Sequence, residues 1–215
     1  MSHPARLLFL LCLALPSLVA CEPLQFGQRI PDSEIIAVDK LSKTDPGAAA
    51  IRLENLLAEK PRDSLGWTIL GHIRADMDEH EAAELAYRKA LQINPKQIEA
   101  MTGQGILARK QGNYQRAMDH YRKAVEVDPD YAQAYSSMTT IALKLEQDDD
   151  AVRYARKGYE LDPSDPVIVA NFAIALHYVG DHKERDRMAA QAKKMGYGRM
   201  DALEALFAGE WTIRD

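Results

Sequence analysis

The sequence predicts an all-α fold that is built as a linear array of repeated helix pairs. A proline recurs every 34 residues, at Pro61, Pro95, Pro129 and Pro163. The tetrapeptide Tyr-Arg-Lys-Ala, which begins at Tyr87, is also repeated unchanged 34 residues later. A fixed period of this length is typical of solenoid proteins, in which each unit buries its apolar surface against its neighbours.

The composition agrees with a folded protein and excludes several function classes. The chain has 215 residues, of which 47% are hydrophobic and 27% charged, so disordered, collagen-like and multi-span membrane proteins do not fit. A net charge of −5 argues against binding to nucleic acid or to an anionic lipid surface. Two cysteines cannot form a disulfide-rich scaffold or a four-cysteine zinc site.

Residues 1–20 read as a secretory signal peptide rather than as part of the fold. Arg6 provides a positive start, and the unbroken apolar run Leu7–Leu15 follows it. Even when it is extended to Ala20, the apolar stretch is shorter than the ~20 residues that a spanning helix needs.

The end of this segment, Leu18-Val19-Ala20-Cys21, resembles the bacterial lipobox. That resemblance implies that Cys21 becomes the first residue of the mature chain and carries diacylglycerol and an acyl chain such as palmitate. An ordinary signal cut after Ala20 is the alternative. Glu22 stands where many lipoproteins of the inner membrane have Asp, which implies an outer-membrane lipoprotein that faces the periplasm. Residues 21–29 would then be a lipidated tether.

Five helix pairs are expected between Ile30 and Arg199. The unit bounds that the prolines predict are about 30–63, 64–97, 98–131, 132–165 and 166–199. Small residues recur where the two helices of a pair should cross, and a Tyr or Phe recurs as a knob between neighbouring pairs. Proline ends the second helix of a unit, because it lacks an amide donor and disfavours helix in the residue before it.

The units keep this pattern to different degrees. Residues 30–63 retain Ala49 and Leu53 but little of a first helix. The middle three units are fuller, with pattern residues Trp67, Leu70, Gly71, Ala83, Tyr87 and Ala90, then Met101, Gly105, Gly112, Ala117, Tyr121 and Ala124, then Tyr135, Met138, Thr139, Ala151, Ala155 and Gly158. The last unit, residues 166–199, lacks the closing proline and has Arg185 where an alanine is expected.

Charged residues support the same placement of the second helices. Acidic residues lie where these helices should begin, at Asp78-Glu79, Asp148–Asp150 and Asp181, because capping and the helix dipole favour acids there. Basic pairs such as Arg122-Lys123 lie toward the opposite end of the same helices.

Residues 200–215 are expected to cap the array. The segment Met200–Ala208 predicts a short amphipathic helix whose apolar residues Met200, Leu203, Leu206 and Phe207 face the last pair. Gly209 can end that helix, so that Trp211 and Ile213 fold back as an apolar lid.

The period and the residues at fixed positions resemble the tetratricopeptide repeat (TPR), a helix–turn–helix unit. The resemblance covers residues 30–199 and implies a right-handed superhelix, an α-solenoid, whose first helices line a concave groove. Such grooves bind proteins or peptides.

The groove positions of that family can be carried onto this sequence. They fall on Thr68, His72, Thr102, Ile106, Arg109, Lys110, Ser136, Thr140, Lys144, Asn171, Ile174 and Tyr178, with Leu65, Leu143, Ala170 and His177 beside them. Short polar groups, apolar spots and cations suit an extended or helical peptide with some acidic character. The Lys and Asn of the carboxylate clamp in chaperone-type relatives are replaced here, so that mode of binding is not expected.

Motifs for catalysis, metals or cofactors are not recognised in the sequence. The segment His80–Glu84 differs from the zinc-protease motif because Glu84 replaces its second histidine. Asp148–Asp150 lacks the alternating ligands of a calcium loop. Gly103-Gln104-Gly105 lies in an expected helix rather than after a strand, so it is not a dinucleotide fingerprint. We therefore expect no enzyme, no cofactor and no small-molecule substrate.

The expected function is that of a lipid-anchored adaptor that helps to assemble or localise an envelope machine of the pilus or secretion type. The helix around Asn171–Leu176 and its glycine-containing exit are similar to those of the TadD-like lipoproteins of tight-adherence (Flp) pilus assembly. Two alternatives remain open. The chain could be an adaptor of envelope enzymes such as peptidoglycan hydrolases, or a structural subunit that associates with itself.

Overall fold

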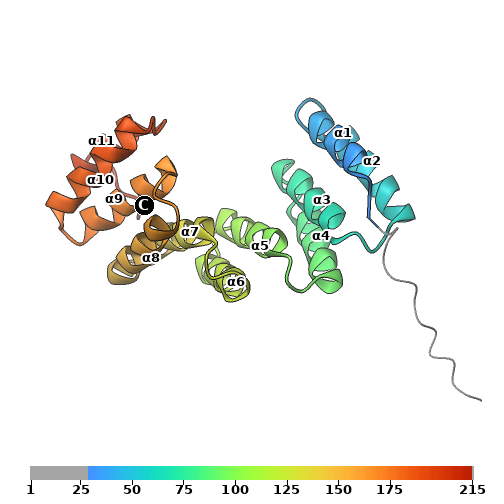
Figure 1. Ribbon diagram of the computed structural model, residues 1–215, viewed down its shortest axis with the longest axis horizontal. Helices are drawn as coiled ribbons and strands as arrows, with labels where there is room; N and C mark the ends of the chain where they lie inside the picture. The colour runs from blue at the N-terminus through green and yellow to red at the C-terminus, as the bar shows by residue number, and fades with distance from the viewer. Residues whose placement is uncertain (1–28, 215) are drawn as a thin grey trace, which may run out of the picture.

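A computed structural model describes residues 29–214, which form eleven α-helices and no strand (Figure 1). The predicted all-α solenoid with a C-terminal capping helix is confirmed. The expected signal peptide, Cys21 and residues 22–28 of the expected tether lie outside the described residues. Within the described part, no helix is both long enough and apolar enough to cross a membrane.

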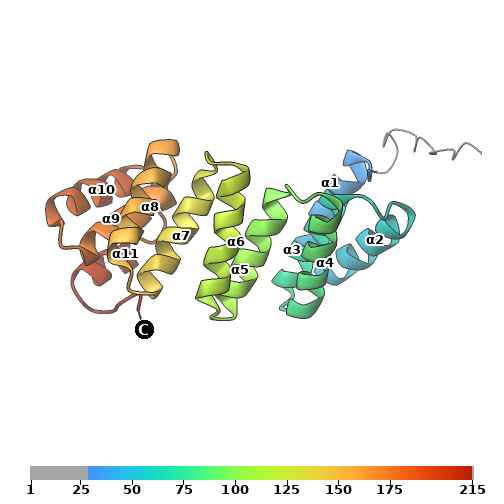
Figure 2. The ribbon, with the colours of Figure 1, turned by 90° about the horizontal axis from the view of Figure 1, so that it is seen from below.

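The helices follow one another as five pairs and a final single helix. The pairs are α1 (Asp32–Ser42) with α2 (Pro46–Glu59), α3 (Ser64–Asp76) with α4 (His80–Ile93), α5 (Ile98–Lys110) with α6 (Tyr114–Val127), α7 (Ala132–Lys144) with α8 (Asp148–Leu161), and α9 (Pro166–Tyr178) with α10 (His182–Lys194). The single helix is α11 (Met200–Phe207). Seen from below, the pairs lie next to one another in chain order (Figure 2).

The end of each middle pair follows from its closing phrase. Helices α4, α6 and α8 end at Ile93, Val127 and Leu161. The next residue of the chain has a non-helical backbone conformation, and the residue after that is proline. At Asp128, for example, φ is −133° and ψ is 97°. Because the residue before a proline is disfavoured in the helical region, these phrases end the second helices as expected.

The turn within a pair repeats one left-handed residue. Asp78, Gly112, Glu146 and Gly180 have φ values of 58°, 74°, 57° and 78°. They stand 34 residues apart, so the period of the sequence also describes the backbone. Asp78, expected to favour the start of α4, therefore lies in this turn instead, and Glu79 precedes α4 without a side-chain capping bond.

The other acidic residues do lie at helix starts. Asp148, Asp149 and Asp150 occupy the first turn of α8, and the carboxylate of Asp181 accepts a hydrogen bond from the amide of Glu184 at 3.1 Å. These negative charges lie at the positive end of the helix dipole.

A tyrosine knob joins neighbouring pairs. The ring of Tyr87, on α4, is 1% exposed and lies against Gly71 of its own pair and Gly103 of the next. A Cβ atom at either glycine would approach the ring to 2.5 Å. Tyr121 packs against Gly105 in the same manner, with a closest approach of 2.8 Å. The two helices can come this close because glycine has no side chain.

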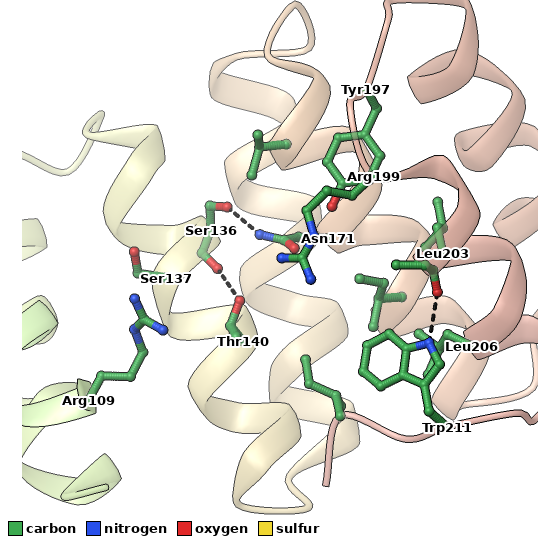
Figure 3. A pocket seen from close by; sticks show the side chains of 14 residues that line it. Arg109, Ser136, Ser137, Thr140, Asn171, Tyr197, Arg199, Leu203, Leu206 and Trp211 are labelled. Carbon is green, nitrogen blue, oxygen red and sulfur yellow. Dashed lines mark hydrogen bonds between the residues drawn. The ribbon is translucent and has the colours of Figure 1, made fainter. Parts of the chain in front are cut away.

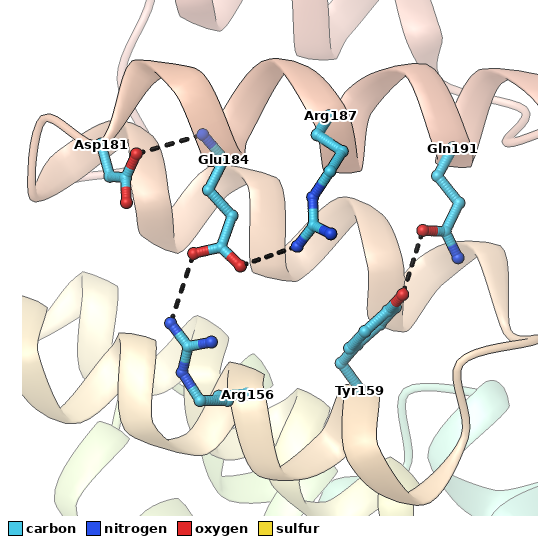
Figure 4. A network of polar contacts seen from close by, with 6 residues as sticks. All are labelled: Arg156, Tyr159, Asp181, Glu184, Arg187 and Gln191. Atoms are coloured by element: carbon cyan, nitrogen blue, oxygen red, sulfur yellow. Dashed lines mark hydrogen bonds and ion pairs between the residues drawn. The ribbon is translucent and has the colours of Figure 1, made fainter.

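Polar contacts link the second helices on the outer side of the last two pairs (Figure 4). Glu184 on α10 contacts Arg156 of α8 at 3.4 Å and Arg187 of its own helix at 2.9 Å. The hydroxyl of Tyr159 donates to the side-chain oxygen of Gln191 at 3.1 Å. Exposed pairs of this kind each contribute about 1 kcal/mol or less.

The apolar core runs along the whole array in three clusters of buried residues. The largest extends from α5 to α11, a second joins α1 to α4, and a third joins α3, α4 and α5. Each pair therefore shares its core only with its neighbours, as expected for a solenoid.

The chain after α10 closes the C-terminal end. Helix α11 buries Leu203 and Leu206, and the indole N–H of Trp211 donates to the carbonyl of Ala202 at 2.9 Å. The backbone amide of Ile213 donates to the hydroxyl of Tyr178 at 2.9 Å, which fastens the tail to α9. Arg214 then forms an ion pair with Asp148 at the start of α8.

Candidate peptide-binding groove

The first helices of the pairs share one face of the array. In Figure 1, α5 and α7 lie on the inner side of an arch, and α6 and α8 lie on its outer side. The first helices α3, α5, α7 and α9 carry all twelve residues that the family resemblance assigned to the groove.

The two predicted residues of α3 differ in exposure. Thr68 is only 1% exposed and its hydroxyl donates to the carbonyl of Ser64 at 2.8 Å, so it lies beneath the surface. His72 is half-buried, and its Nδ1 lies 3.2 Å from the hydroxyl of Tyr87. Burial lowers the pKa of His72, which the negative charges of Asp76 and Glu99 oppose.

Helix α5 presents the most exposed part of the predicted set. Ile106 is 37% exposed, and Arg109 and Lys110 are also exposed. The ammonium group of Lys110 lies 3.4 Å from the carbonyl oxygen of Ala75. Thr102 is buried and its hydroxyl donates to carbonyl oxygens of its own helix, so Ile106 and Arg109 remain as contact residues.

The predicted residues of α7 and α9 lie across from one another. The side-chain amide of Asn171 donates to the hydroxyl of Ser136 at 2.7 Å, which ties the two helices together on the groove side. Thr140 is half-buried one turn further along α7, and Ile174 is 8% exposed one turn further along α9.

Other predicted residues mark the margins of the face. Lys144 is half-buried at the end of α7, and Tyr178 is half-buried where the C-terminal tail crosses it. Leu143 and Ala170 are 1% and 0% exposed, so their assignment to the groove surface is wrong. Both lie on the sides of their helices that pack into the core, because each helix of this array touches neighbours on more than one side.

A cavity of about 350 Å³ opens at the C-terminal end of the groove (Figure 3). Five of the predicted groove residues line it: Arg109, Ser136, Thr140, Asn171 and Ile174. The remaining lining residues were not predicted; these are Ser137, Val167, Tyr197, Arg199, Ala202, Leu203, Leu206, Trp211 and Ile213.

Most of the missed residues come from the cap rather than from a repeat. Tyr197 and Arg199 belong to the turn before α11, and Trp211 and Ile213 belong to the tail. No repeat position marks them. The amphipathic pattern of residues 200–208 placed the cap against the last pair, but did not indicate that it also reaches the groove.

The cavity carries positive charge without a carboxylate in its lining. Arg109 and Arg199 are exposed, and neither forms an ion pair with a carboxylate of the described residues. Beneath Arg109, burial raises the pKa of Tyr121, while the Ser137 hydroxyl and the Arg109 charge oppose that rise.

A second cavity, of about 910 Å³, lies near the N-terminal half of the array. Its lining mixes both signs of charge, with Arg29 and Arg62 beside Asp63 and Glu99. The carboxylate of Asp63 is engaged already, because it accepts hydrogen bonds from the amides of Ile30 at 2.6 Å and Gly66 at 3.0 Å.

The acidic and histidine side chains of the described residues do not gather into a metal site. Across residues 29–214, no cluster of three or more His, Cys, Asp or Glu side chains could hold a metal ion. His80 and Glu84 lie on α4, where Glu84 pairs with Arg116 at 2.6 Å.

The comparisons with known proteins concern both the sequence and the fold. The sequence model described as "Cytochrome c-type biogenesis protein H TPR domain" matches residues 26–157. No curated protein matches the chain.

Several solved structures share the fold at low sequence identity. The Pseudomonas aeruginosa pilF structure has a TM-score of 0.71 and 18% identity, and covers 83% of this chain and 85% of its own. MamA from Desulfovibrio magneticus RS-1 has a TM-score of 0.65 and 17% identity, with coverage of 78% and 96%. YrrB, described as a TPR protein with an unusual peptide-binding site, has a TM-score of 0.61 and 17% identity, with coverage of 83% and 91%.

Proposed function

Because this chain belongs to the family of the cytochrome c-type biogenesis protein H TPR domain, we propose that it is a non-catalytic adaptor that binds a protein partner along the inner face of its array. One observation carries the proposal. Ile106 and Arg109 are exposed on α5, and Arg109 also lines the cavity between α7, α9 and the cap. A surface that could bind a peptide therefore extends over three units. The fold shared with YrrB, a peptide-binding TPR protein, supports a peptide partner.

The proposal includes a place in the cell. The lipobox-like segment that ends at Cys21 supports a lipid anchor in the bacterial envelope, with the array facing the periplasm from the outer membrane. Two or more acyl chains make such an anchor stable, at about 0.8 kcal/mol per buried CH₂ group. There the adaptor would assist assembly or localisation of a pilus or secretion-type machine.

The anchor is tested by fractionation of a Cys21→Ser variant. We expect the native protein in the membrane fraction, with the mass of two or more acyl chains. The variant should be soluble or uncleaved and without that mass. If the variant fractionates with the same mass as the native protein, the lipid anchor is wrong.

The groove is tested by crosslinking in cells. A photo-crosslinking amino acid is placed at Ile106, which is 37% exposed on an inner helix, or at Leu85, which is 47% exposed on the second helix α4. We expect a discrete adduct from position 106 and none from position 85. The variant Arg109→Glu should remove the adduct without lowering the unfolding temperature, because Arg109 is exposed and forms no ion pair in the described structure.

The mass of the adduct separates the alternatives. A different envelope protein supports the adaptor, and its identity distinguishes a pilus or secretion machine from a peptidoglycan hydrolase. An adduct of twice the mass of the chain would indicate self-association. Crosslinks from position 85 alone, or from neither position, would contradict the groove assignment.

A further inference from the structure

We propose that the cavity at the C-terminal end of the groove binds a peptide segment in which an acidic side chain stands next to, or next but one to, a large apolar side chain. This inference rests on the proposed function and specifies the chemistry of the partner. It concerns one subsite, which is made by α5, α7, α9 and the cap (Figure 3).

The acidic part of the ligand follows from the charges around the cavity. Arg109 comes from α5 and Arg199 from the turn before α11, and both side chains extend toward the space between them in Figure 3. No Asp or Glu lines the cavity, although acidic residues outnumber basic ones in the chain by 32 to 27. Two guanidinium groups with no carboxylate of their own favour a carboxylate from a partner.

Polar groups beside the arginines add to the hydrogen-bonding capacity of the cavity. The hydroxyls of Ser137 and Thr140 line the same wall, and Asn171 lies between them and the cap. The Thr140 hydroxyl already donates to the carbonyl of Ser136 at 3.4 Å, so Ser137 is the hydroxyl donor on this wall. Ser137 is half-buried. Hydroxyls and guanidinium groups that face one cavity can donate to the same carboxylate.

The apolar part of the ligand follows from the opposite wall. Ile174, Leu203 and Leu206 are 8%, 3% and 1% exposed, and they form a closed apolar surface. Trp211 is 40% exposed and stands beside them as part of the lining. An apolar side chain that enters the cavity would cover the exposed part of this indole. Both apolar surfaces would then be removed from water, which favours binding.

The size of the cavity limits the occupant to a short segment. Its volume of about 350 Å³ is near the lower end of the range of about 300–1,000 Å³ that is usual for ligand pockets. It accommodates one or two side chains of a peptide, not a whole helix.

Hydrogen bonds hold the walls before a ligand arrives. Asn171 is bonded to Ser136 at 2.7 Å, and Trp211 is bonded to the carbonyl of Ala202 at 2.9 Å. Tyr178 anchors the tail through the hydroxyl of Thr212 at 2.8 Å and through the amide of Ile213. Walls that are already ordered reduce the entropy cost of binding.

The second cavity of the protein lacks these features. Asp63 and Glu99 stand beside its two arginines, and its lining contains fewer large apolar side chains, namely Leu65 and Ile93. Of these two cavities, the one at the C-terminal end of the groove is therefore expected to select an acidic and apolar segment.

The test is a selection from a phage-displayed library of random dodecapeptides on the full chain. We expect the enriched peptides to share an Asp or Glu that is either adjacent to Phe, Trp, Leu, Ile or Met or separated from it by one residue. One enriched peptide is then synthesised with a fluorescein label, together with a copy in which the acidic residue is replaced by its amide. Binding is measured by fluorescence anisotropy at two salt concentrations.

Variants connect the peptide to the cavity. Arg109→Glu with Arg199→Glu should raise the dissociation constant about tenfold or more, and Trp211→Ala about threefold or more, because each removes a group that the ligand contacts. The amide copy should bind weakly to the native chain, and high salt should weaken the acidic peptide more than its amide copy. Arg122→Glu, on the second helix α6, is the matched control and should change the constant by less than about twofold.

The outcomes distinguish this inference from the groove proposal. Circular dichroism shows whether the double variant is folded; if it is not, Arg199→Gln alone replaces it. Enriched peptides without an acidic residue, or equal binding to the native chain and the folded variant, would overturn this inference. The groove proposal would survive that result if Ile106→Asp weakened the same peptides. Failure to enrich any peptide would overturn both proposals.

Discussion

The two ends of the array are closed in different ways. At the C-terminal end, α9 has eight buried residues and lies between α7, α8, α10 and α11. At the N-terminal end of the described structure, α1 buries one residue, Val38, and leaves Ile36 67% exposed. Helix α11 thus covers the last inner helix, which buries as many residues as α5 and α7 do, and it also supplies one wall of a cavity.

The difference has an energetic consequence for a protein whose units are stabilised by their neighbours. In such an array, a unit that is covered on both sides contributes two interfaces, whereas an end unit contributes one. We therefore expect substitutions in α9 to affect the stability of the array more than substitutions in α1.

The largest effect is expected at Phe172, which is 1% exposed in α9. Phe172→Ala should lower the free energy of unfolding by about 3–5 kcal/mol, because it leaves a cavity in the main cluster. Ile36→Ala, at the exposed position of α1, should change it by about 0.5 kcal/mol or less. Urea denaturation followed by circular dichroism measures both values. Equal losses would show that the ends do not differ in this way.

A smaller effect tests the packing of the two helices within one unit of the N-terminal half. Gly71→Ala places a Cβ atom 2.5 Å from the ring of Tyr87. This clash should destabilise the protein by about 1–3 kcal/mol, although alanine is the better helix former. Gly47→Ala, in α2, has 3.5 Å or more to its nearest neighbours and should be neutral or stabilising by up to about 1 kcal/mol. Thermal unfolding of the two variants compares them directly, and a stabilising Gly71→Ala would refute the close packing.

The smallest effect concerns pH and the cap. Burial lowers the pKa of His177 below its ordinary value of 6.5, and the charges of Arg185 and His182 lower it further. The ring lies 5.1 Å from that of Phe207, on α11. Since the unfolded chain binds the proton more readily, stability is full above about pH 6.5 and falls as the pH drops toward the lower pKa of the folded state.

The same sign applies to His72 and His120, whose pKa values burial also lowers. We expect the unfolding temperature to fall by a few degrees between about pH 7.5 and about pH 5.5. His177→Gln should reduce that dependence, and hydrogen exchange of α11 should respond to pH less in this variant. An unfolding temperature that rises on acidification would contradict the assignment.

The repeat made most of the fold predictable. Proline recurs where a helix must end, glycine where two helices come close together, and tyrosine where a large side chain fills the space between helices. The sequence can therefore be divided into helices before their packing is known. Helix α1 was harder to recognise, because an end helix with one buried residue has little apolar pattern to detect.

The candidate site was predictable only in part. The groove positions carried over from the tetratricopeptide repeat include Arg109 and Ile174, which line the cavity, but also Leu143 and Ala170, which are buried. The position of a residue within its repeat does not show whether its side chain faces the groove or packs against the neighbouring helix. Trp211 was expected to fold back as part of a lid, but neither Trp211 nor Arg199 was expected to line the groove, because their contact with it depends on how the cap packs against several helices.

The tyrosine knob also means that the units of this array are not interchangeable. Tyr87 needs a residue without a side chain at position 103 of the following unit, where a Cβ atom would lie 2.5 Å from its ring. The unit after that has Ser137 at the equivalent position. Removing residues 98–131 would bring Ser137 opposite Tyr87, so the shortened array could not simply rejoin. Steric matching at this edge therefore favours the present order of the two units, and an exchange that brought Ser137 opposite Tyr87 would be penalised in the folded protein.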